Sequence, residues 1–452
     1  MRNRPGSPGG SDSESRLSPA PKVSDSADVA VIGAGYVGLT TAVCLAHVGH
    51  RVCCGEADAE KVRRLERGEP TIVEAGLAEL LREGIDSGRL RFVVGAAAAV
   101  EGAEAVFICV PTPGRPDGTA DVSAIEDVTT EMAPHLRYGA VVVNKSTVPV
   151  GSTLLVERLL ERPDVSVVSN PEFLREGSAV HDALHPDRIV VGADDQGAAA
   201  RVGALYSSLR APLIVTDPAT AETIKYASNA FLATKLSFIN AVARLCEVVG
   251  AEVRDVLLGM GYDPRIGFDY LRPGPGWGGS CLPKDTRAIL YMAESAGYEF
   301  PILREVLATN DAQISSVLQK IGTLIGGPVT GEVVAVWGLT FKAGTDDRRD
   351  SPAAEIVRRL ADAGASIRVF DPTVRARVPE LPDSVQVHVD AYAACEGAKV
   401  LAVLTEWEEF RWLDFGKVKE LLALPQIVDA RNLLDPVALR RMGFSYVGVG
   451  RR

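Results

Sequence analysis

The feature that most constrains the fold of this chain is a short apolar run that is followed at once by three glycines. Residues 29–32 are apolar, residues 33–38 read Gly-Ala-Gly-Tyr-Val-Gly, and the apolar residues of 39–48 recur at helical spacing. A buried strand, a glycine turn and a helix in this order are typical of the first unit of a doubly wound, dinucleotide-binding sheet. The residues expected to receive the dinucleotide there are Gly33, Gly35, Tyr36, Val37 and Gly38.

A carboxylate follows the second apolar run, 51–54, about 18 positions after Gly38. At this place Glu56 can bind both ribose hydroxyls, and its charge would repel a 2′-phosphate. The position therefore favours NAD over NADP. The alternative is that Glu56 is a solvated acid in a turn.

Size and composition narrow the class of protein. A chain of 452 residues is expected to form two or three domains, and its net charge of −11 argues against broad binding to nucleic acid or an anionic membrane. No apolar run is long enough to span a bilayer, and no secretory signal is visible. The seven cysteines show no metal-ligand spacing, so we expect no metal, free thiols and a cytoplasmic protein. An anionic substrate would need locally placed Lys and Arg.

Polar residues follow several later apolar runs, where the carboxyl ends of parallel strands bind ligands. Thr112 follows the run 105–110 and Thr147 follows 140–143, and both are expected to face a cofactor or substrate, although each could instead cap a helix. Glu172 and Glu176 follow the run 165–169. These two carboxylates are candidates for proton transfer or water activation.

One long helical pattern covers residues 221–249. Lys225 and Asn229 are four residues apart in it and therefore share a face. They are candidates for a site, although a solvated lysine on a packing helix fits the spacing equally well. A long helix between domains also suits a subunit interface.

A Gly- and Pro-rich loop, 273–280, leads to Cys281, Lys284 and Asp285. If a helix begins near Pro283, the thiol lies at its N-terminal end, where the helix dipole is expected to lower the thiol pKa. A cysteine chosen at random is most often a small buried hydrophobic residue. The glycines, the lysine and the carboxylate favour a reactive nucleophile instead.

The C-terminal third repeats the strand–glycine–helix pattern from residue 332 without a full dinucleotide signature. We therefore expect an α/β protein with two doubly wound domains joined by a helical region that contains one long helix. The mixed-charge loop 341–352 follows a strand of the second sheet and suits a second nucleotide. The expected boundaries are a disordered tail at 1–27, a cofactor domain at 28–205, a helical region at 206–325 and a second nucleotide domain at 326–452.

Several motifs occur in one order over residues 28–450, and together they resemble the UDP-glucose/GDP-mannose dehydrogenase family. These motifs are residues 33–38, 145–149, 170–174, 278–281 and 341–342. The resemblance implies NAD-dependent, four-electron oxidation of the C6 alcohol of a nucleotide sugar to a carboxylate. It also implies a covalent thiohemiacetal and thioester on Cys281, and a homodimer or higher homo-oligomer.

The resemblance also implies roles for individual residues. The catalytic set is Cys281, Lys225, Asn229, Asp285, Glu172 and Thr147. Further cofactor contacts are Glu56, Lys61, Thr112, Thr147, Glu176 and Arg349. The nucleotide-sugar set is Glu172, Phe173, Leu174, Lys225, Asn229, Arg265, Gly278, Lys342 and Arg431, with Arg265 in the site of this or a neighbouring subunit. Glu56 departs from the family, which usually has Asp at the ribose position.

Three alternatives remain open on the sequence. Phe173-Leu174 and residues 263–267 favour UDP-glucose as the sugar nucleotide, ahead of GDP-mannose and UDP-N-acetylhexosamines. A two-electron dehydrogenase of the 3-hydroxyacid type shares the first domain and a long helix, but it needs neither Cys281 nor a second doubly wound domain. A sugar-nucleotide-binding scaffold without catalysis would not need Cys281, Lys225, Asn229 and Asp285 together.

Overall fold

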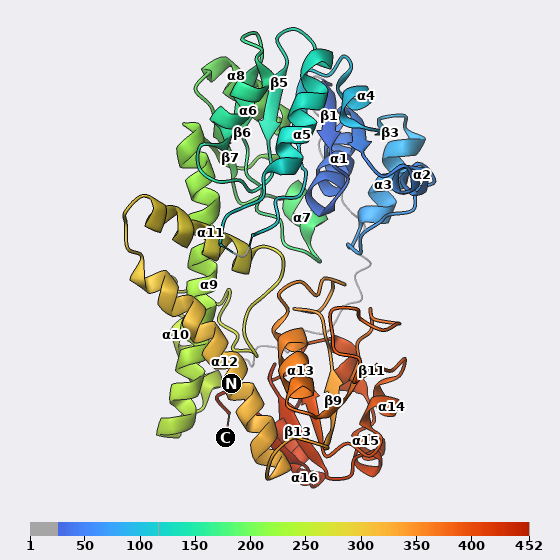
Figure 1. Cartoon of the computed structure of the whole chain (residues 1–452), viewed down its shortest axis with the longest axis vertical. Helices are drawn as coiled ribbons and strands as arrows, with labels where there is room; N and C mark the ends of the chain where they lie inside the picture. Colours follow the sequence, from blue (N-terminus) through green and yellow to red (C-terminus); the bar gives the residue numbers. More distant parts are fainter. Residues whose placement is uncertain (1–25, 116, 452) are drawn as a thin grey trace, which may run out of the picture.

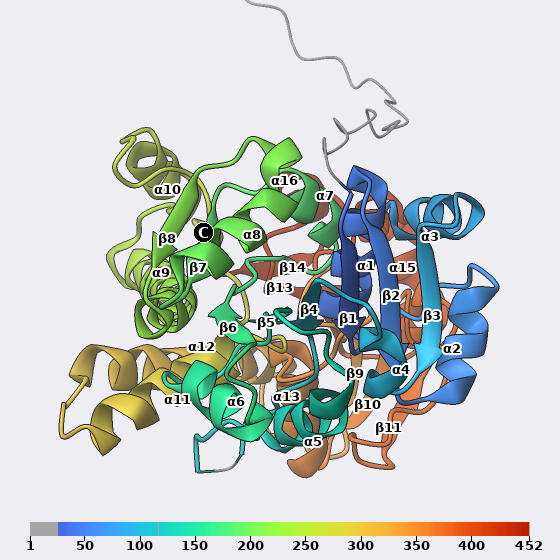
Figure 2. The same cartoon turned by 90° about the horizontal axis from the view of Figure 1, so that it is seen from above.

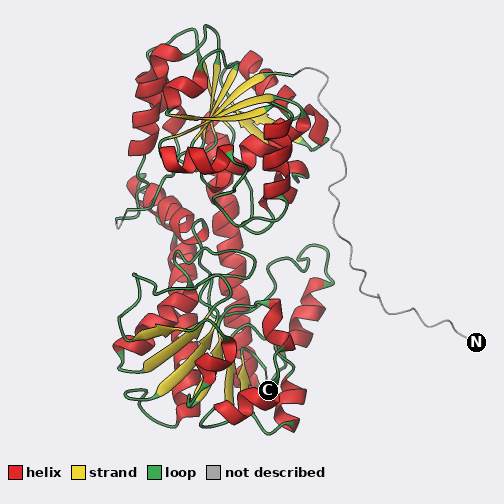
Figure 3. Cartoon of the chain, turned by 90° about the vertical axis from the view of Figure 1, so that its right-hand side faces the viewer, coloured by secondary structure: helices red, strands yellow, loops and turns green. Residues whose placement is uncertain are grey.

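The computed structural model describes residues 26–115 and 117–451, and within them the chain forms two α/β domains joined by long helices (Figure 1). The expected tail at 1–27 lies almost wholly outside the described residues. Figure 3 shows the two sheets at opposite ends of the molecule, each covered by helices. The predicted architecture of two doubly wound domains around a helical region is confirmed. Within the described residues, no helix is both long enough and apolar enough to cross a membrane.

The first sheet has eight strands in the order β3-β2-β1-β4-β5-β6-β7-β8, fanned out in Figure 2. Its neighbouring strands pair in parallel except for β6 and β7, which are antiparallel. The strands are β1 (Asp28–Ile32), β2 (Arg51–Glu56), β3 (Leu90–Val94), β4 (Ala105–Ile108), β5 (Val141–Asn144), β6 (Ser166–Ser169), β7 (Ile189–Gly192) and β8 (Leu213–Thr216). Because β8 pairs with β7, this sheet continues past residue 205, where the sequence pattern suggested a boundary.

Both faces of the first sheet are buried, which explains the unbroken apolar runs in its strands. Val29 and Val31 of β1 pack into one hydrophobic cluster, and Ala30 and Ile32 pack into another on the opposite face. The covering helices are α1 (Tyr36–Val48), α2 (Ala59–Glu66), α3 (Leu77–Asp86), α4 (Ala96–Val100), α5 (Ser123–Met132), α6 (Ser152–Leu160), α7 (Ala179–Leu184) and α8 (Gln196–Leu205).

The helical region contains α9 (Pro218–Val249), α10 (Val253–Gly261), α11 (Leu282–Ser295) and α12 (Pro301–Ile325). At 32 residues, α9 spans about 48 Å. Asp217 caps it by accepting a hydrogen bond from the Thr220 N–H, and Pro218 occupies its first turn, so it begins three residues before the predicted start. The chain turns between Ser295 and Pro301, so α11 and α12 are separate helices.

The second sheet is parallel throughout, in the order β11-β10-β9-β12-β13-β14. Its strands are β9 (Val333–Trp337), β10 (Ser366–Phe370), β11 (Val385–Val387), β12 (Val400–Val403), β13 (Gln426–Asp429) and β14 (Ser445–Gly448). Its helices are α13 (Pro352–Asp362), α14 (Ala391–Cys395), α15 (Phe415–Leu421) and α16 (Pro436–Arg441). Residues of α9 and α12 join the hydrophobic core on one face of this sheet, so the helical region and the second domain pack together.

Candidate active site

A cavity of about 1270 Å³, which we call the cofactor cavity, opens at the carboxyl ends of the first sheet and reaches the cysteine loop and the second domain. It brings together most of the residues that the sequence assigned to the cofactor, and four of those assigned to chemistry or substrate. The predicted residues that line it are Gly33, Gly35, Tyr36, Val37, Glu56, Lys61, Thr112, Thr147, Glu172, Leu174, Glu176, Cys281 and Arg349. Residues of three separate parts of the chain therefore meet in one space.

The glycine turn has the geometry that a dinucleotide requires. A Cβ atom on Gly38 would lie 1.8 Å from the carbonyl oxygen of Gly33, so only glycine lets α1 approach β1 this closely. A Cβ atom on Gly35 would meet nothing within 4 Å, and the backbone there faces open space beside the N-terminus of α1. That space can accept a pyrophosphate against backbone N–H groups.

Glu56 is the last residue of β2, and its carboxylate is held in place. Its Oε2 accepts hydrogen bonds from the Ala34 N–H at 3.0 Å and from Lys61 Nζ at 2.9 Å. Burial alone would raise the pKa of Glu56, but the bonds to Lys61 and to the backbone outweigh burial and lower it. An ionised acceptor at this position fits the ribose hydroxyls of NAD and disfavours a 2′-phosphate.

Cys281 is the N-cap residue of α11, and Leu282 is the first helical residue, as the position of Pro283 suggested. Its Sγ lies 3.5 Å from Ser280 Oγ. Burial raises the pKa of the thiol, and the Lys225 ammonium lowers it by less. The expectation of a lowered pKa from the helix dipole is therefore wrong for the protein without ligands, because loss of solvation outweighs the favourable charges around the sulfur.

Four polar side chains meet in a buried cluster behind the thiol, which we call the buried polar cluster: Glu172, Lys225, Asn229 and Asp285. Lys225 Nζ donates to Glu172 Oε1 at 2.8 Å, and Asn229 Nδ2 donates to Asp285 Oδ2 at 2.6 Å. All four are buried, so the face of α9 that carries Lys225 and Asn229 points into the protein and not to solvent. The solvated alternative for this face is excluded.

The charges in the buried polar cluster set its protonation. Burial lowers the pKa of Lys225, but Glu172, Cys281 and Asp285 outweigh burial, and the net effect is a raised pKa. Burial raises the pKa of Glu172, and Lys225 more than reverses that effect. Lys225 is therefore a cation and Glu172 an anion at neutral pH. Lys284 adds a second cation, whose Nζ lies 2.7 Å from Asp285 Oδ1.

The cysteine loop is held against the second domain by close backbone contacts. A Cβ atom on Gly278 would lie 2.0 Å from the carbonyl oxygen of Asp350, and the Gly279 N–H donates to the Arg349 carbonyl at 3.1 Å. Only a residue without a side chain permits this approach. Gly278 therefore positions the loop that carries Cys281.

Four other residues assigned to the sugar nucleotide lie outside the lining of this cavity. Arg431 Nε donates to the Leu404 carbonyl at 3.0 Å and pairs with Glu406. Lys342 Nζ lies 5.5 Å from the centre of the Phe341 ring, and burial lowers its pKa. Phe173 packs its ring against the Arg188 guanidinium, 3.6 Å from the ring centre. Arg265 is separate from all of them: its side chain is 87% exposed and it pairs with Asp263.

Glu176 links the first domain to the cysteine loop and to the second domain across the cavity. Ser280 Oγ donates to Glu176 Oε1 at 2.9 Å, and Arg349 lies 3.6 Å from the same oxygen. Asp347 pairs with Arg349 at 2.7 Å. Burial, and then Asp347, raise the pKa of Glu176 to about 7. Ser280 belongs to the motif 278–281, but no local pattern indicates its contact with Glu176, which is 104 positions away in the chain.

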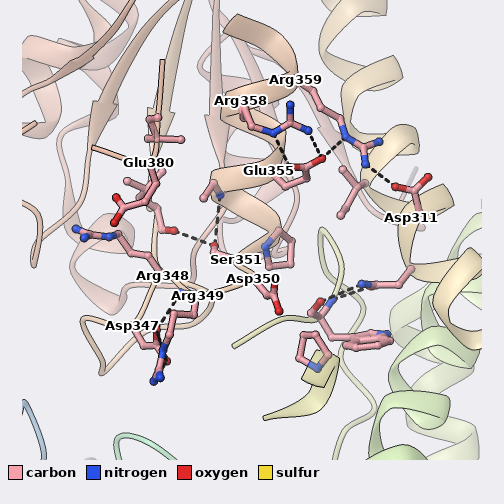
Figure 4. Close-up of a pocket in the computed structure, with 18 of the residues that line it drawn as sticks. Asp311, Asp347, Arg348, Arg349, Asp350, Ser351, Glu355, Arg358, Arg359 and Glu380 are labelled. Carbon is pink, nitrogen blue, oxygen red and sulfur yellow. Dashed lines mark hydrogen bonds and ion pairs between the residues drawn. The ribbon is translucent and has the colours of Figure 1, made fainter. Parts of the chain in front are cut away.

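A second cavity of about 730 Å³ lies between α12, α13 and the loop 346–351 (Figure 4). The loop lines both cavities: Asp346, Asp347, Arg349 and Asp350 are shared, and Arg348 lines only the second. Ion pairs run along its rim from Arg358 through Glu355 and Arg359 to Asp311. The cofactor cavity and this one therefore adjoin along the loop 346–351, and Arg287 of α11 also lines both.

Comparison with known proteins agrees with this arrangement. Three models of one family match in order: its NAD binding domain over residues 27–210, its central domain over 219–312 and its UDP binding domain over 335–436. The chain belongs to the UDP-glucose/GDP-mannose dehydrogenase family, whose members are oxidoreductases, and NAD is its cofactor. The resemblance found in the sequence is confirmed.

Full-length relatives support the same assignment. The UDP-glucose 6-dehydrogenase of Pseudomonas aeruginosa is 44% identical over 438 residues, which cover 93% of this chain and 97% of the relative. That of Rhizobium meliloti is 44% identical over 433 residues, with 94% and 99% covered. The structure of a UDP-glucose dehydrogenase from Pyrobaculum islandicum superposes with a TM-score of 0.88 at 39% identity, with 96% and 99% covered.

Proposed function

We propose that this protein oxidises the C6 alcohol of UDP-glucose to the carboxylate of UDP-glucuronate in two NAD-dependent steps on one covalently held sugar. The observation that carries the proposal is that Cys281 lines the same cavity as the glycine turn of the cofactor domain. The two full-length relatives named UDP-glucose 6-dehydrogenase support the choice of sugar. NAD, when bound, accepts a hydride from C6 in each oxidation.

The first oxidation requires a group that takes the proton of the C6 hydroxyl. Because Lys225 is already protonated, a water held by Asp285 is the better acceptor, and Lys225 and Asn229 serve as donors to the oxygen. The product of this step is an aldehyde. The thiol of Cys281 adds to its carbonyl carbon, the sulfur–carbon bond forms, and the thiol proton ends on the hemiacetal oxygen.

The second oxidation removes a hydride from C6 and the hydroxyl proton of the thiohemiacetal, which passes to the water held by Asp285, and it gives a thioester that water then cleaves. Glu172 is an ionised carboxylate paired with Lys225, and Thr147 lines the same cavity. We assign Glu172, Asp285 and Thr147 to the attacking water, whose oxygen bonds to C6 while the sulfur leaves and regains a proton. Covalent capture keeps the aldehyde bound between the two oxidations.

We assign the uridine diphosphate to the second domain. The family model that matches residues 335–436 is described as a UDP binding domain. Lys342 and Arg431 supply positive charge beside a substrate diphosphate in a chain of net charge −11. Gly278, Phe173 and Leu174 complete the proposed sugar-nucleotide site. The proposed domain boundaries are 28–205, 206–325 and 326–452. Strand β8 follows the first boundary in the chain but pairs with β7 of the first sheet.

We also propose that two copies of the chain associate through α9. Phe231, Phe238 and Leu245 are spaced by seven residues, so they share one face, and they are 68%, 57% and 56% exposed. An exposed apolar stripe on a helix suits a self-complementary contact about a two-fold axis. Arg265, which contacts no other proposed site residue of its own chain, would then be available to a neighbouring subunit.

A substrate panel with product stoichiometry tests the function. Initial rates are measured with UDP-glucose, GDP-mannose and UDP-N-acetylmannosamine, and NADH is counted per sugar oxidised. We expect activity with UDP-glucose and two NADH per sugar. Activity with GDP-mannose alone would overturn the sugar assignment, one NADH per sugar would indicate a two-electron dehydrogenase, and binding without turnover would indicate a scaffold.

A further inference from the structure

Glu74 lies in the loop between α2 and α3, and its carboxylate joins two segments of the cofactor cavity. Its Oε2 accepts hydrogen bonds from the Tyr36 hydroxyl and from the Gly177 N–H, the latter at 2.8 Å. Its Oε1 accepts from the Ala179 N–H at 2.8 Å. The Gly177 N–H is also 2.7 Å from the Tyr36 oxygen. Three donors from two distant segments thus converge on one carboxylate.

Both segments belong to the proposed cofactor site. Tyr36 is the first residue of α1 and lines the cavity beside the glycine turn. Gly177 directly follows Glu176, which lines the same cavity and accepts the hydrogen bond from Ser280. Glu74 therefore determines the separation between the start of α1 and the loop that meets the second domain.

Only a carboxylate satisfies all three donors. Its two oxygens offer acceptors alone, whereas an amide has one acceptor oxygen and an NH₂ group that would face an N–H. Burial raises the pKa of Glu74, and the Gly177 and Ala179 N–H groups oppose that rise, as does Lys342. The side chain is half-buried and does not belong to the lining of the cofactor cavity, so its effect is exerted through its partners.

We propose that Glu74 is a positioning residue for NAD, which holds Tyr36 and the Glu176 loop in the arrangement that receives the cofactor. The inference rests on the proposed function only in that Tyr36 and Glu176 contact NAD. It does not depend on which sugar nucleotide is oxidised.

The test is the dissociation constant of NAD, measured by titration without any sugar nucleotide. E74Q is expected to weaken NAD binding roughly tenfold, because a charge-assisted bond is lost and one N–H is left facing an amide. At saturating NAD, kcat should change far less than KM for NAD. Wild-type NAD affinity in a folded E74Q protein would overturn the proposal. Because the dissociation constant is measured without turnover, an incorrect sugar assignment would leave that result intact.

Glu222 of α9 supplies a matched control, because its carboxylate also accepts hydrogen bonds from backbone N–H groups. Its carboxylate accepts from the N–H groups of Gly151 at 2.6 Å and Thr153 at 3.0 Å at the start of α6, and none of these residues lines the cofactor cavity. E222Q should lower thermal stability and leave the NAD dissociation constant unchanged. An equal loss of NAD affinity in E222Q would mean that the effect of E74Q reflects general destabilisation.

A double-mutant cycle tests whether Glu74 acts through the Glu176 loop. In an E176Q background, E74Q should weaken NAD binding by much less than in the wild type, because the two residues serve one contact. Fully additive effects of E74Q and E176Q on NAD affinity would overturn the inference that Glu74 acts through the Glu176 loop. If E74Q fails to fold, Y36F removes the phenol hydroxyl with its hydrogen bonds to Glu74 and to the Gly177 N–H, and it should weaken NAD binding by a smaller factor; unchanged affinity in Y36F would count against the proposal.

Discussion

The Nζ atom of Lys225 lies 2.8 Å from Oε1 of Glu172, and the two side chains are only 4% and 5% exposed. Lys225 belongs to α9 and Glu172 follows β6, so this pair joins the helical region to the first sheet at the cavity. A buried ion pair contributes little net stability, but the loss of one partner leaves an unpaired charge. The pair therefore links the stability of the site to its chemistry.

We expect K225M to remove the cation and leave Glu172 buried without its partner. Stability should fall by about 3–5 kcal/mol, the range for breaking a buried pair, and turnover should fall by orders of magnitude. Thermal unfolding and NADH formation measure the two effects. In the double variant K225M/E172Q most of the lost stability should return while activity stays absent. A double variant no more stable than K225M would contradict the assignment of the loss to the unpaired charge.

C281S should abolish steady-state turnover and leave NAD binding intact. A serine hydroxyl is a much weaker nucleophile than a thiolate, so NADH formation is expected to fall roughly a thousandfold or more. The measurement is the rate of NADH formation beside the NAD dissociation constant. C246S, which changes a buried thiol of α9 that lines neither cavity, is the control and should remain active. Full activity in C281S would refute covalent catalysis.

Glu176 predicts a dependence of stability on pH. Its pKa is raised from an ordinary 4.5 to about 7, so the folded state binds this proton more tightly than the unfolded state does. Its contribution to stability is therefore complete below about pH 4.5 and is lost as the pH rises through about 7. In E176Q this loss of stability with rising pH should disappear. The measurement is the midpoint of thermal unfolding of the wild type and of E176Q between about pH 4.5 and pH 7. Parallel curves of midpoint against pH would mean that another group titrates.

F238D should separate the proposed dimer, because a charge would be placed in the middle of the apolar stripe of α9. Sedimentation velocity is expected to show a dimer for the wild type and a monomer for the variant. Trp412, which is 80% exposed and lies in the second domain, provides the control, and W412D should leave the oligomeric state unchanged. A monomeric wild-type protein would remove the basis of this proposal.

Much of the fold could be predicted because its signals are local. The apolar run and glycines at 29–38 predict the strand, the turn and the helix directly, and Pro283 indicates the start of α11 to within a residue. The membership of β8 in the first sheet was missed because strand pairing is not local.

The sequence predicts which residue types form the candidate site, but it does not predict their burial, their pairing or their pKa values. Helical spacing shows that Lys225 and Asn229 share a face, but only packing shows that this face is buried against Glu172 and Asp285. The raised pKa of Cys281 likewise depends on how much solvent the surrounding chain removes. Glu74 escaped notice because its partners, Tyr36 and Gly177, lie 38 and 103 positions away.

The sequence by itself determined the two doubly wound domains and the glycine turn between β1 and α1, because periodicity and glycine spacing act over a few residues. The tertiary structure alone decided which of these residues share a cavity, which charges are paired and how protons are held. Those properties depend on distances between segments far apart in the chain and on the solvent they exclude, and no local pattern contains either quantity.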